Sequence, residues 1–88
     1  MPRNVSEPPA VGAILRTYRT ERGLTQEEVA FATGLDRTYI GMVERGERRP
    51  TVHAVSLILD ALNVTWTRMG AAIDAARGEA ADSRRSSS

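Results

Sequence analysis

Residues 25–49, TQEEVAFATGLDRTYIGMVERGERR, carry the pattern that decides the fold of this chain. The hydroxyl of Thr25 can cap a helix, and Glu28, three residues later, completes a capping box, so we expect a helix to begin here. Gly34 can adopt a left-handed backbone conformation without a Cβ penalty and is expected to end that helix. Asp36 can then cap a second helix. The sequence therefore predicts two short helices joined by a tight turn.

The second of these helices is predicted to have two chemically different faces. Helical spacing gathers Tyr39, Ile40 and Val43 on one side, which predicts a packed face. The opposite side carries Arg37, Thr38, Gly41, Met42 and Arg45. Arginine can bind guanine through two hydrogen bonds, a hydroxyl can bond a base edge or a phosphate, and methionine can contact a thymine methyl. This free face therefore has the chemistry of a surface that reads base pairs in DNA.

Gly41 is unusual because it falls in the interior of this predicted helix. A glycine there costs about 1 kcal/mol relative to alanine, so the absence of a side chain needs a reason. Close approach of the helix to the wall of a DNA groove is the reason that we expect.

The segment resembles the helix-turn-helix of the phage repressor and Cro family, over about Leu15 to Met69. The matching residues are Gln26, Glu28, Val29, Ala30, Gly34, Leu35, Tyr39, Ile40, Glu44 and Gly46. The resemblance implies an all-α fold, a compact five-helix bundle with a lambda-repressor-like DNA-binding domain. It also implies that residues 36–45 enter the major groove of double-stranded DNA. Small autoregulators such as restriction-modification controller proteins are similar in length and in lacking a ligand domain.

The candidate DNA contacts divide into two groups. The expected base-reading residues are Arg37, Thr38 and Met42. The expected contacts to the DNA backbone are Gln26, Arg45, Arg48 and Arg49. For the three arginines the alternative is a solvated charged turn in which Glu47 offsets one charge. For Gln26 the alternative is a plain polar residue at a helix start.

The resemblance also implies a structural pair between Arg19 in the first helix and Glu44 at the end of the third. If the pair is partly buried, the loss of one partner leaves an uncompensated charge and costs more than the loss of a surface ion pair. The alternative is two solvated surface charges.

The remaining chain is predicted to form one domain, residues 10–77, between a disordered N-terminal arm, residues 1–9, and a disordered tail, residues 78–88. Apolar spacing predicts a helix over residues 10–22 that ends at Gly23. Thr51 is expected to cap a fourth helix. Its predicted buried stripe is Val52, Val55, Ile58, Leu59 and Leu62.

A fifth helix is predicted to start at Thr65 and to carry Trp66, Met69 and Ile73. This apolar edge can fold back onto the domain or be shared with a second copy, and for Trp66 both interpretations stay open. In the resembling family this region often forms the dimer contact, which implies a homodimer. Two recognition helices related by a twofold axis would read half-sites about 34 Å apart, so we expect a near-palindromic operator and a role in transcriptional regulation.

Composition argues against several other classes of protein. The 88 residues have no cysteine and a net charge of +1, so we expect no disulfide or thiolate metal site and only a local nucleic-acid footprint. No stretch approaches the roughly 20 apolar residues of a membrane span, which favours a cytoplasmic protein. The single histidine, His53, has no nearby partner ligands, and no nucleophile and base occur at a recognisable spacing. We therefore expect no enzyme activity, no metal or cofactor and no small-molecule ligand.

The alternative function is that of a protein-binding adaptor or an antitoxin-like module with the same fold. Phe31 falls on the opposite side of its helix from Val29 and Ala30, and Leu57 points away from the buried stripe. Together with Trp66 they would contact a protein partner. Chance exposure of Phe31 explains its position equally well.

Overall fold

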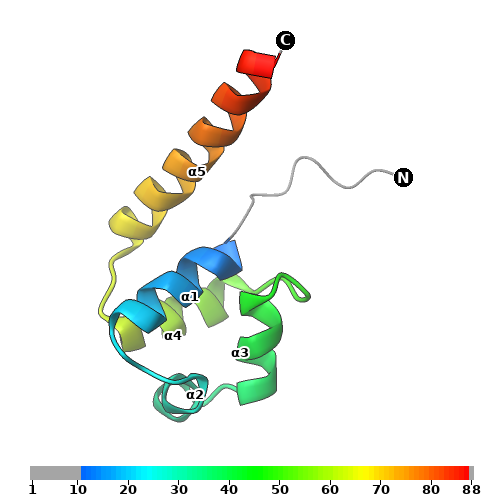
Figure 1. Ribbon diagram of the computed structural model, residues 1–88. Coiled ribbons are helices and arrows are strands. Elements are labelled where there is room, and N and C mark those ends of the chain that lie inside the picture. The colour runs from blue at the N-terminus through cyan, green and yellow to red at the C-terminus, as the bar shows by residue number, and fades with distance from the viewer. Residues whose placement is uncertain (1–10, 88) are drawn as a thin grey trace.

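The structure, a computed structural model, describes residues 11–87 and consists of five α-helices over that range (Figure 1). They are α1 (Val11–Glu21), α2 (Gln26–Thr33), α3 (Arg37–Glu44), α4 (Val52–Leu62) and α5 (Trp66–Ser87). Helices α1 to α4 form a bundle, and α5 extends away from it (Figure 1). The predicted all-α fold with a helix-turn-helix is confirmed, whereas the predicted N-terminal arm lies outside the described residues.

Local hydrogen bonds fix both ends of α2 and the starts of α3 and α4 at the positions that the sequence predicts. The Thr25 hydroxyl accepts from the Glu28 backbone N–H at 3.0 Å, and the Glu28 carboxylate accepts from the Thr25 N–H at 2.8 Å. Gly34 ends α2 with a φ of 77°, in the left-handed region. Asp36 and Thr51 cap α3 and α4 through their side chains. The turn between α2 and α3 is therefore encoded by residues within it.

One core receives side chains from all five helices. Its largest fully buried members are Leu15, Ile40, Leu59, Leu62, Met69, Val29 and Val43. Val52, predicted to belong to the buried stripe of α4, is instead 76% exposed. It is the first residue of α4, at the end of the helix, where the helical period alone does not ensure that a neighbouring element covers the side chain.

Helix α5 differs from the prediction in two respects. Met69, expected at a dimer contact, is only 1% exposed and belongs to the core of its own chain. Trp66 is half-exposed, and Ile73 packs partly buried against the core. The helix also continues to Ser87, although the sequence predicts a tail without regular structure from residue 78. Alanine, glutamate and arginine in this segment favour a helix even without an apolar period.

Helices α1 and α3 approach each other very closely at Gly12. A Cβ added to Gly12 would overlap the carbonyl oxygen of Val43 and lie 2.8 Å from its carbonyl carbon. Gly12 is therefore required for this helix contact. Within the described part of the chain, no helix is both long and apolar enough to cross a membrane.

Candidate nucleic-acid interface

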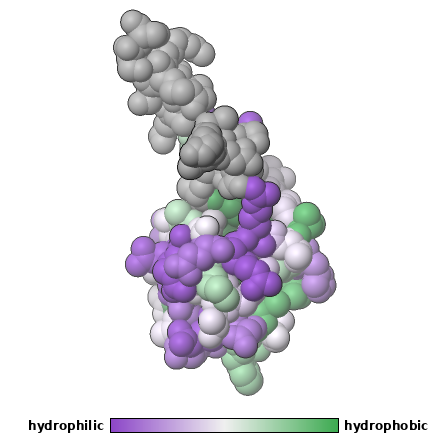
Figure 2. Space-filling view, turned by 90° about the vertical axis from the view of Figure 1, so that its right-hand side faces the viewer, coloured by the Kyte–Doolittle hydropathy of each residue, from purple (hydrophilic) through white to green (hydrophobic). Residues whose placement is uncertain are grey.

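The outward face of α3 presents polar side chains on an exposed surface. Arg37 and Thr38 are exposed at its first turn, and Arg45 is exposed at its C-terminal cap. Figure 2 shows the side of the bundle on which α3 lies, and hydrophilic residues predominate there. Met42, the third predicted base-reading residue, is only partly exposed. The structure thus leaves Arg37 and Thr38 the more accessible of the predicted base-reading residues.

Gly41 is buried, although helical spacing places it on this same side of α3. A Cβ at this position would meet Arg45 Nη1 at 3.1 Å and Gln26 Oε1 at 3.5 Å. The protein's own polar side chains therefore fill the space outside Gly41, where the sequence led us to expect the wall of a DNA groove.

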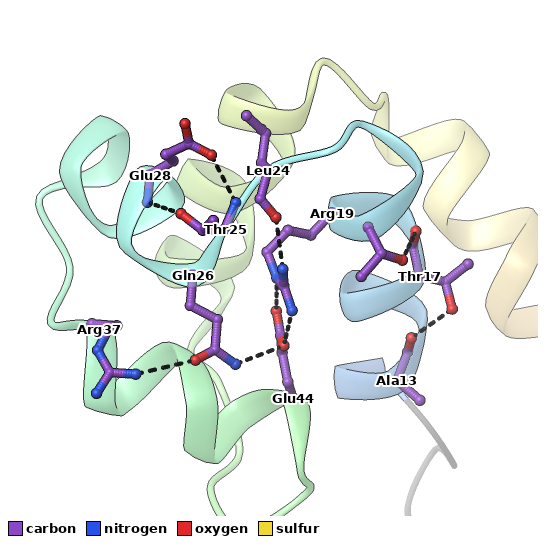
Figure 3. Close-up of polar contacts among 10 residues, drawn as sticks. Ala13, Thr17, Arg19, Leu24, Thr25, Gln26, Glu28, Arg37 and Glu44 are labelled. Carbon is purple, nitrogen blue, oxygen red and sulfur yellow. Dashed lines mark hydrogen bonds and ion pairs between the residues drawn. The ribbon is translucent and has the colours of Figure 1, made fainter.

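The structure brings Arg19 and Glu44 together as a bidentate ion pair (Figure 3). Arg19 Nε donates to Glu44 Oε2 at 2.7 Å, and Arg19 Nη2 donates to Glu44 Oε1 at 2.9 Å. Arg19 Nη1 also donates to the carbonyl oxygen of Leu24 at 2.7 Å. The two side chains are 12% and 5% exposed, so the pair lies between α1 and α3 and is not a solvated surface contact.

The pair stabilises the charged form of both residues. Burial raises the pKa of Glu44, but hydrogen bonds from Arg19 and Gln26 and the nearby positive charge outweigh it, so this pKa stays below its ordinary value of 4.5. The hydrogen bond to Glu44 raises the pKa of Arg19 against the opposing effect of burial. Glu44 is therefore a carboxylate at neutral pH and acts only as a hydrogen-bond acceptor.

Gln26, the first residue of α2, bridges this buried pair to the outward face of α3 (Figure 3). Its Nε2 donates to Glu44 Oε1 at 3.0 Å, and its Oε1 accepts from Arg37 Nη1 at 3.4 Å. Arg37 Nε also lies 3.7 Å from Glu27 Oε2. The sequence pattern gives no sign of the contact with Glu27, because it joins two helices across the turn.

The loop after α3 holds its arginines in three different surroundings. Arg45 donates two hydrogen bonds to Glu47, at 2.9 and 3.1 Å, and both side chains are exposed. The guanidinium of Arg48 lies 5.4 Å from the centre of the Tyr39 ring, a cation–π contact. Arg49 is exposed and lines an apolar groove beside α5.

This groove has a volume of about 290 Å³. It is lined by Val11, Arg49, Pro50, Val52, Val55, Trp66, Met69 and Ile73. All three residues of the predicted dimer contact therefore line one hollow, and the exposed side chain of Val52 lies there too. A second apolar feature is Phe31 on α2, which is 93% exposed, whereas Leu57 is partly buried.

Comparison with known proteins finds similar chains. Residues 15–68 match a family model described as helix-turn-helix. The control protein C.SmaI of Serratia marcescens is 45% identical over 55 residues, which are 62% of this chain and 66% of that protein. The uncharacterized HTH-type transcriptional regulator YqaF of Bacillus subtilis (strain 168) is 43% identical over 53 residues, 60% of this chain and 70% of that one. The match thus spans just under two thirds of C.SmaI.

Solved structures of restriction-modification controller proteins have a similar fold. C.AhdI from Aeromonas hydrophila has a TM-score of 0.65 and 40% identity, over 68% of this chain and 91% of that chain. C.Esp1396I, solved as a tetramer in complex with its natural 35 base-pair operator, has a TM-score of 0.68 and 34% identity. That match covers 73% of this chain and 84% of the other.

Proposed function

Because the chain belongs to the helix-turn-helix family, we propose that it is a transcriptional regulator that binds specific sequences in double-stranded DNA. The observation that carries the proposal is the outward face of α3, on which Arg37 and Thr38 are exposed beside the N-terminus of α2. An exposed helix with these side chains can enter a major groove and bond base edges. The protein has no enzymatic role in this proposal and acts in the cytoplasm, where it meets the DNA.

The proposed contacts differ in what they recognise. Arg37, Thr38 and the partly exposed Met42 contact base edges and discriminate between sequences. The contacts to phosphate oxygens are made by Gln26, Arg45, Arg48 and Arg49. Phosphates are the same in every sequence, so this second group supplies affinity and sets the position of the protein on the duplex.

The proposed assembly is a homodimer in which the apolar groove beside α5 meets the same groove of a second copy. Trp66 is 50% exposed and Val52 is 76% exposed at this groove, so its apolar surface is open to a partner. Met69 supports the groove from the core, and Ile73 forms part of its wall. The C.Esp1396I tetramer on its operator supports a regulator that binds DNA in more than one copy. A twofold dimer would recognise a near-palindromic operator.

Selection of bound duplexes from a random pool tests the proposal directly. We expect an enriched, near-palindromic motif whose half-sites lie about one helical turn, roughly 34 Å, apart. Sedimentation of the free protein measures whether a dimer is present before DNA is added. If no motif is enriched, and if binding to random duplex at low salt is absent, the proposal is wrong.

Two variants separate base reading from backbone contact. Arg37→Ala should remove the preference at one base pair of the enriched motif, because a good bidentate contact discriminates by about 1 to 3 kcal/mol. Arg49→Ala should weaken binding to every sequence and make the salt dependence shallower by about one unit. Equal loss on operator and random duplex for Arg37→Ala would contradict the base-reading role.

The 93% exposure of Phe31 supports a second candidate function, in which the fold serves as a protein-binding adaptor. An adaptor should bind random duplex weakly and show no steep dependence on salt. Phe31→Ser separates the two candidates, since a DNA regulator should keep its operator affinity and an adaptor should lose its protein partner.

A further inference from the structure

We infer that Tyr18 and Arg22 are positioning residues that fix the direction of α5 and, through it, the spacing of operator half-sites that the protein accepts. The inference rests on the proposed dimeric DNA-binding function and deepens it. Tyr18 lies in α1 and Arg22 directly follows that helix, and the Arg22 backbone N–H donates to the Tyr18 carbonyl oxygen at 3.1 Å. The two side chains are called the brace below, because together they span the link between α4 and α5.

This link is short, and it joins the core to the proposed dimer contact. Helix α4 ends at Leu62 and α5 begins at Trp66, so only residues 63–65 connect them. Asn63 turns the chain with a φ of 60°, in the left-handed region, and Val64 is buried. The link lies beside the C-terminal end of α1 (Figure 1). Contacts from that end can therefore decide the direction in which α5 leaves the bundle.

Arg22 holds the side of the link that belongs to α4. Its Nε donates to the carbonyl oxygen of Leu62 at 2.8 Å, and its Nη2 donates to the carbonyl oxygen of Asn63 at 3.3 Å. Carbonyl groups at the C-terminal end of a helix have no partner within the helix, so they accept from outside it. One guanidinium thus ties the end of α1 to the point where the chain leaves α4.

Tyr18 holds the other side of the link, the first turn of α5. Its hydroxyl donates to the carbonyl oxygen of Arg68 at 3.5 Å, and the Arg68 guanidinium lies 5.2 Å from the centre of the Tyr18 ring. The ring is buried, so packing fixes its position, and the neighbouring Met69 lies in the core. The first turn of α5 is therefore held through its main chain and through a side chain.

The direction of α5 matters for the proposed dimer because α5 carries much of the groove. Trp66, Met69 and Ile73 line it. Helix α3 is fixed to the same bundle through Ile40 and Val43 in the core. In a dimer formed through the groove, the angle between α5 and the bundle therefore sets the distance between the two α3 helices.

This distance has to match the DNA closely. A half-site moved by one base pair shifts by about 3.4 Å along the duplex and rotates by about 35° around it. A dimer whose α5 helices are held rigidly cannot follow that movement, so it should reject a shifted half-site. A dimer whose α5 helices have a loosened attachment should tolerate the shift.

Operators whose half-sites lie one base pair closer together or farther apart than in the selected motif test the inference on the full chain. The original chain should bind these shifted operators about tenfold more weakly than the selected one, a penalty comparable to that of a mismatched base pair. Arg22→Ala and Arg68→Ala should reduce the penalty to about threefold or less, because the loss of preorganisation affects the selected spacing most.

Two further variants complete this test. Arg77→Ala is the matched control, since it removes the same charge from an exposed position of α5 outside the groove, and it should keep the full penalty. Tyr18→Phe removes the hydroxyl but keeps the ring, so its penalty should be intermediate. Urea midpoints report stability separately. Partial unfolding lowers the affinity for both operators equally and leaves their ratio unchanged.

A measurement without DNA tests the role of the brace directly. The chain has no cysteine, so Thr20→Cys and Asp74→Cys provide two exposed sites for spin labels, one on α1 and one on α5. Labelled chains diluted with excess unlabelled protein should give a narrow distribution of distances between the labels. Arg22→Ala should broaden this distribution, whereas Arg77→Ala should not.

The outcomes distinguish the inference from the function on which it rests. If Arg22→Ala and Arg68→Ala keep the full spacing penalty while the original chain prefers one spacing, the inference is wrong and the DNA-binding function stands. A broadened distance distribution with an unchanged penalty would also overturn it, because α5 would then not set the spacing. If the selected motif contains no paired half-sites, the proposed dimer fails together with the inference.

Discussion

Two arginine–glutamate pairs lie near the C-terminal end of α3 and differ mainly in burial. In the inner pair, Arg19 donates two hydrogen bonds to Glu44, and the side chains are 12% and 5% exposed. In the outer pair, Arg45 donates two hydrogen bonds to Glu47, and the side chains are 57% and 54% exposed. The donors, acceptors and distances are nearly the same. Burial therefore decides what each pair does.

The inner pair cannot exchange its partner without cost, because removal of one member leaves a buried charge unpaired. It therefore belongs to the scaffold that holds α1 against α3. The outer pair is surrounded by water, and its arginine can exchange a carboxylate for a phosphate oxygen. The same chemistry therefore serves the fold where it is buried, whereas the exposed pair matches the phosphate contact proposed for Arg45.

The largest effect should come from Gly12→Ala, which pushes apart the helices that enclose the inner pair. The new Cβ would overlap the carbonyl oxygen of Val43, which is backbone and cannot rotate away. We expect a loss of about 3 kcal/mol or more, in the range of severe core overpacking, as measured by urea denaturation.

Gly70→Ala is the matched control for this substitution. Gly70 lies within α5 and has no neighbouring atom within 4 Å of an added Cβ, so alanine should stabilise the protein by up to about 1 kcal/mol. If both alanine variants had the same stability, the close contact at Gly12 would not constrain α1 and α3.

A smaller but pH-dependent effect should follow from Glu44→Gln. At neutral pH the variant leaves the Arg19 charge without its carboxylate, but the glutamine amide oxygen can still accept a hydrogen bond, so we expect a loss of about 1 to 3 kcal/mol. The pKa of Glu44 is lowered in the folded protein, so the stabilisation by the charged pair is fully present above about pH 4.5 and is lost as the pH falls through the folded-state pKa.

Urea denaturation at a series of pH values checks this sign. The difference in unfolding free energy between the original chain and Glu44→Gln should be constant near neutrality and shrink below about pH 4.5. A difference that stays the same down to pH 3 would show that the charge of Glu44 contributes nothing to the fold.

The smallest effect on stability should follow from Glu47→Gln in the outer pair. Unlike the preceding variants, this one should also change the affinity for DNA. The urea midpoint should not change measurably, because both partners are exposed. Binding to random duplex should become tighter, because Arg45 no longer has a carboxylate that competes with phosphate. Fluorescence titrations at several salt concentrations measure this.

Arg45→Ala should act in the opposite direction on binding, with weaker affinity and a salt dependence shallower by about one unit. Its stability should also remain unchanged. If either substitution in the outer pair lowered stability as much as Glu44→Gln, the difference in role between the two pairs would disappear.

Much of the helix-turn-helix could be predicted from the sequence, because the features that define it are local. Thr25 and Glu28 bond each other's backbone across three residues, and Asp36 caps α3 through Thr38. The placement of Arg37 on an exposed face follows from helical spacing. The roles proposed for it and for the other candidate DNA contacts stay predictions.

Contacts between separate elements could not be read from the sequence in the same way. The sequence pattern treats Val52 and Met69 as similar apolar residues, yet one is 76% and the other 1% exposed. It gives no reason to single out Gly12, because only the approach of α3 makes a side chain there impossible. Burial depends on which distant element covers a residue, and spacing within one helix does not contain that information.

By itself, therefore, the sequence determined where α2 and α3 begin, where the turn between them lies and which side of α3 is polar, since hydrogen bonds and periodicity within a few residues are enough for that. Only the tertiary structure decided that Glu44 is buried with Arg19 and that Gln26 spans from this pair to Arg37. These contacts join three helices across 11 to 25 residues of chain. They exist because packing of the core brings those helices together.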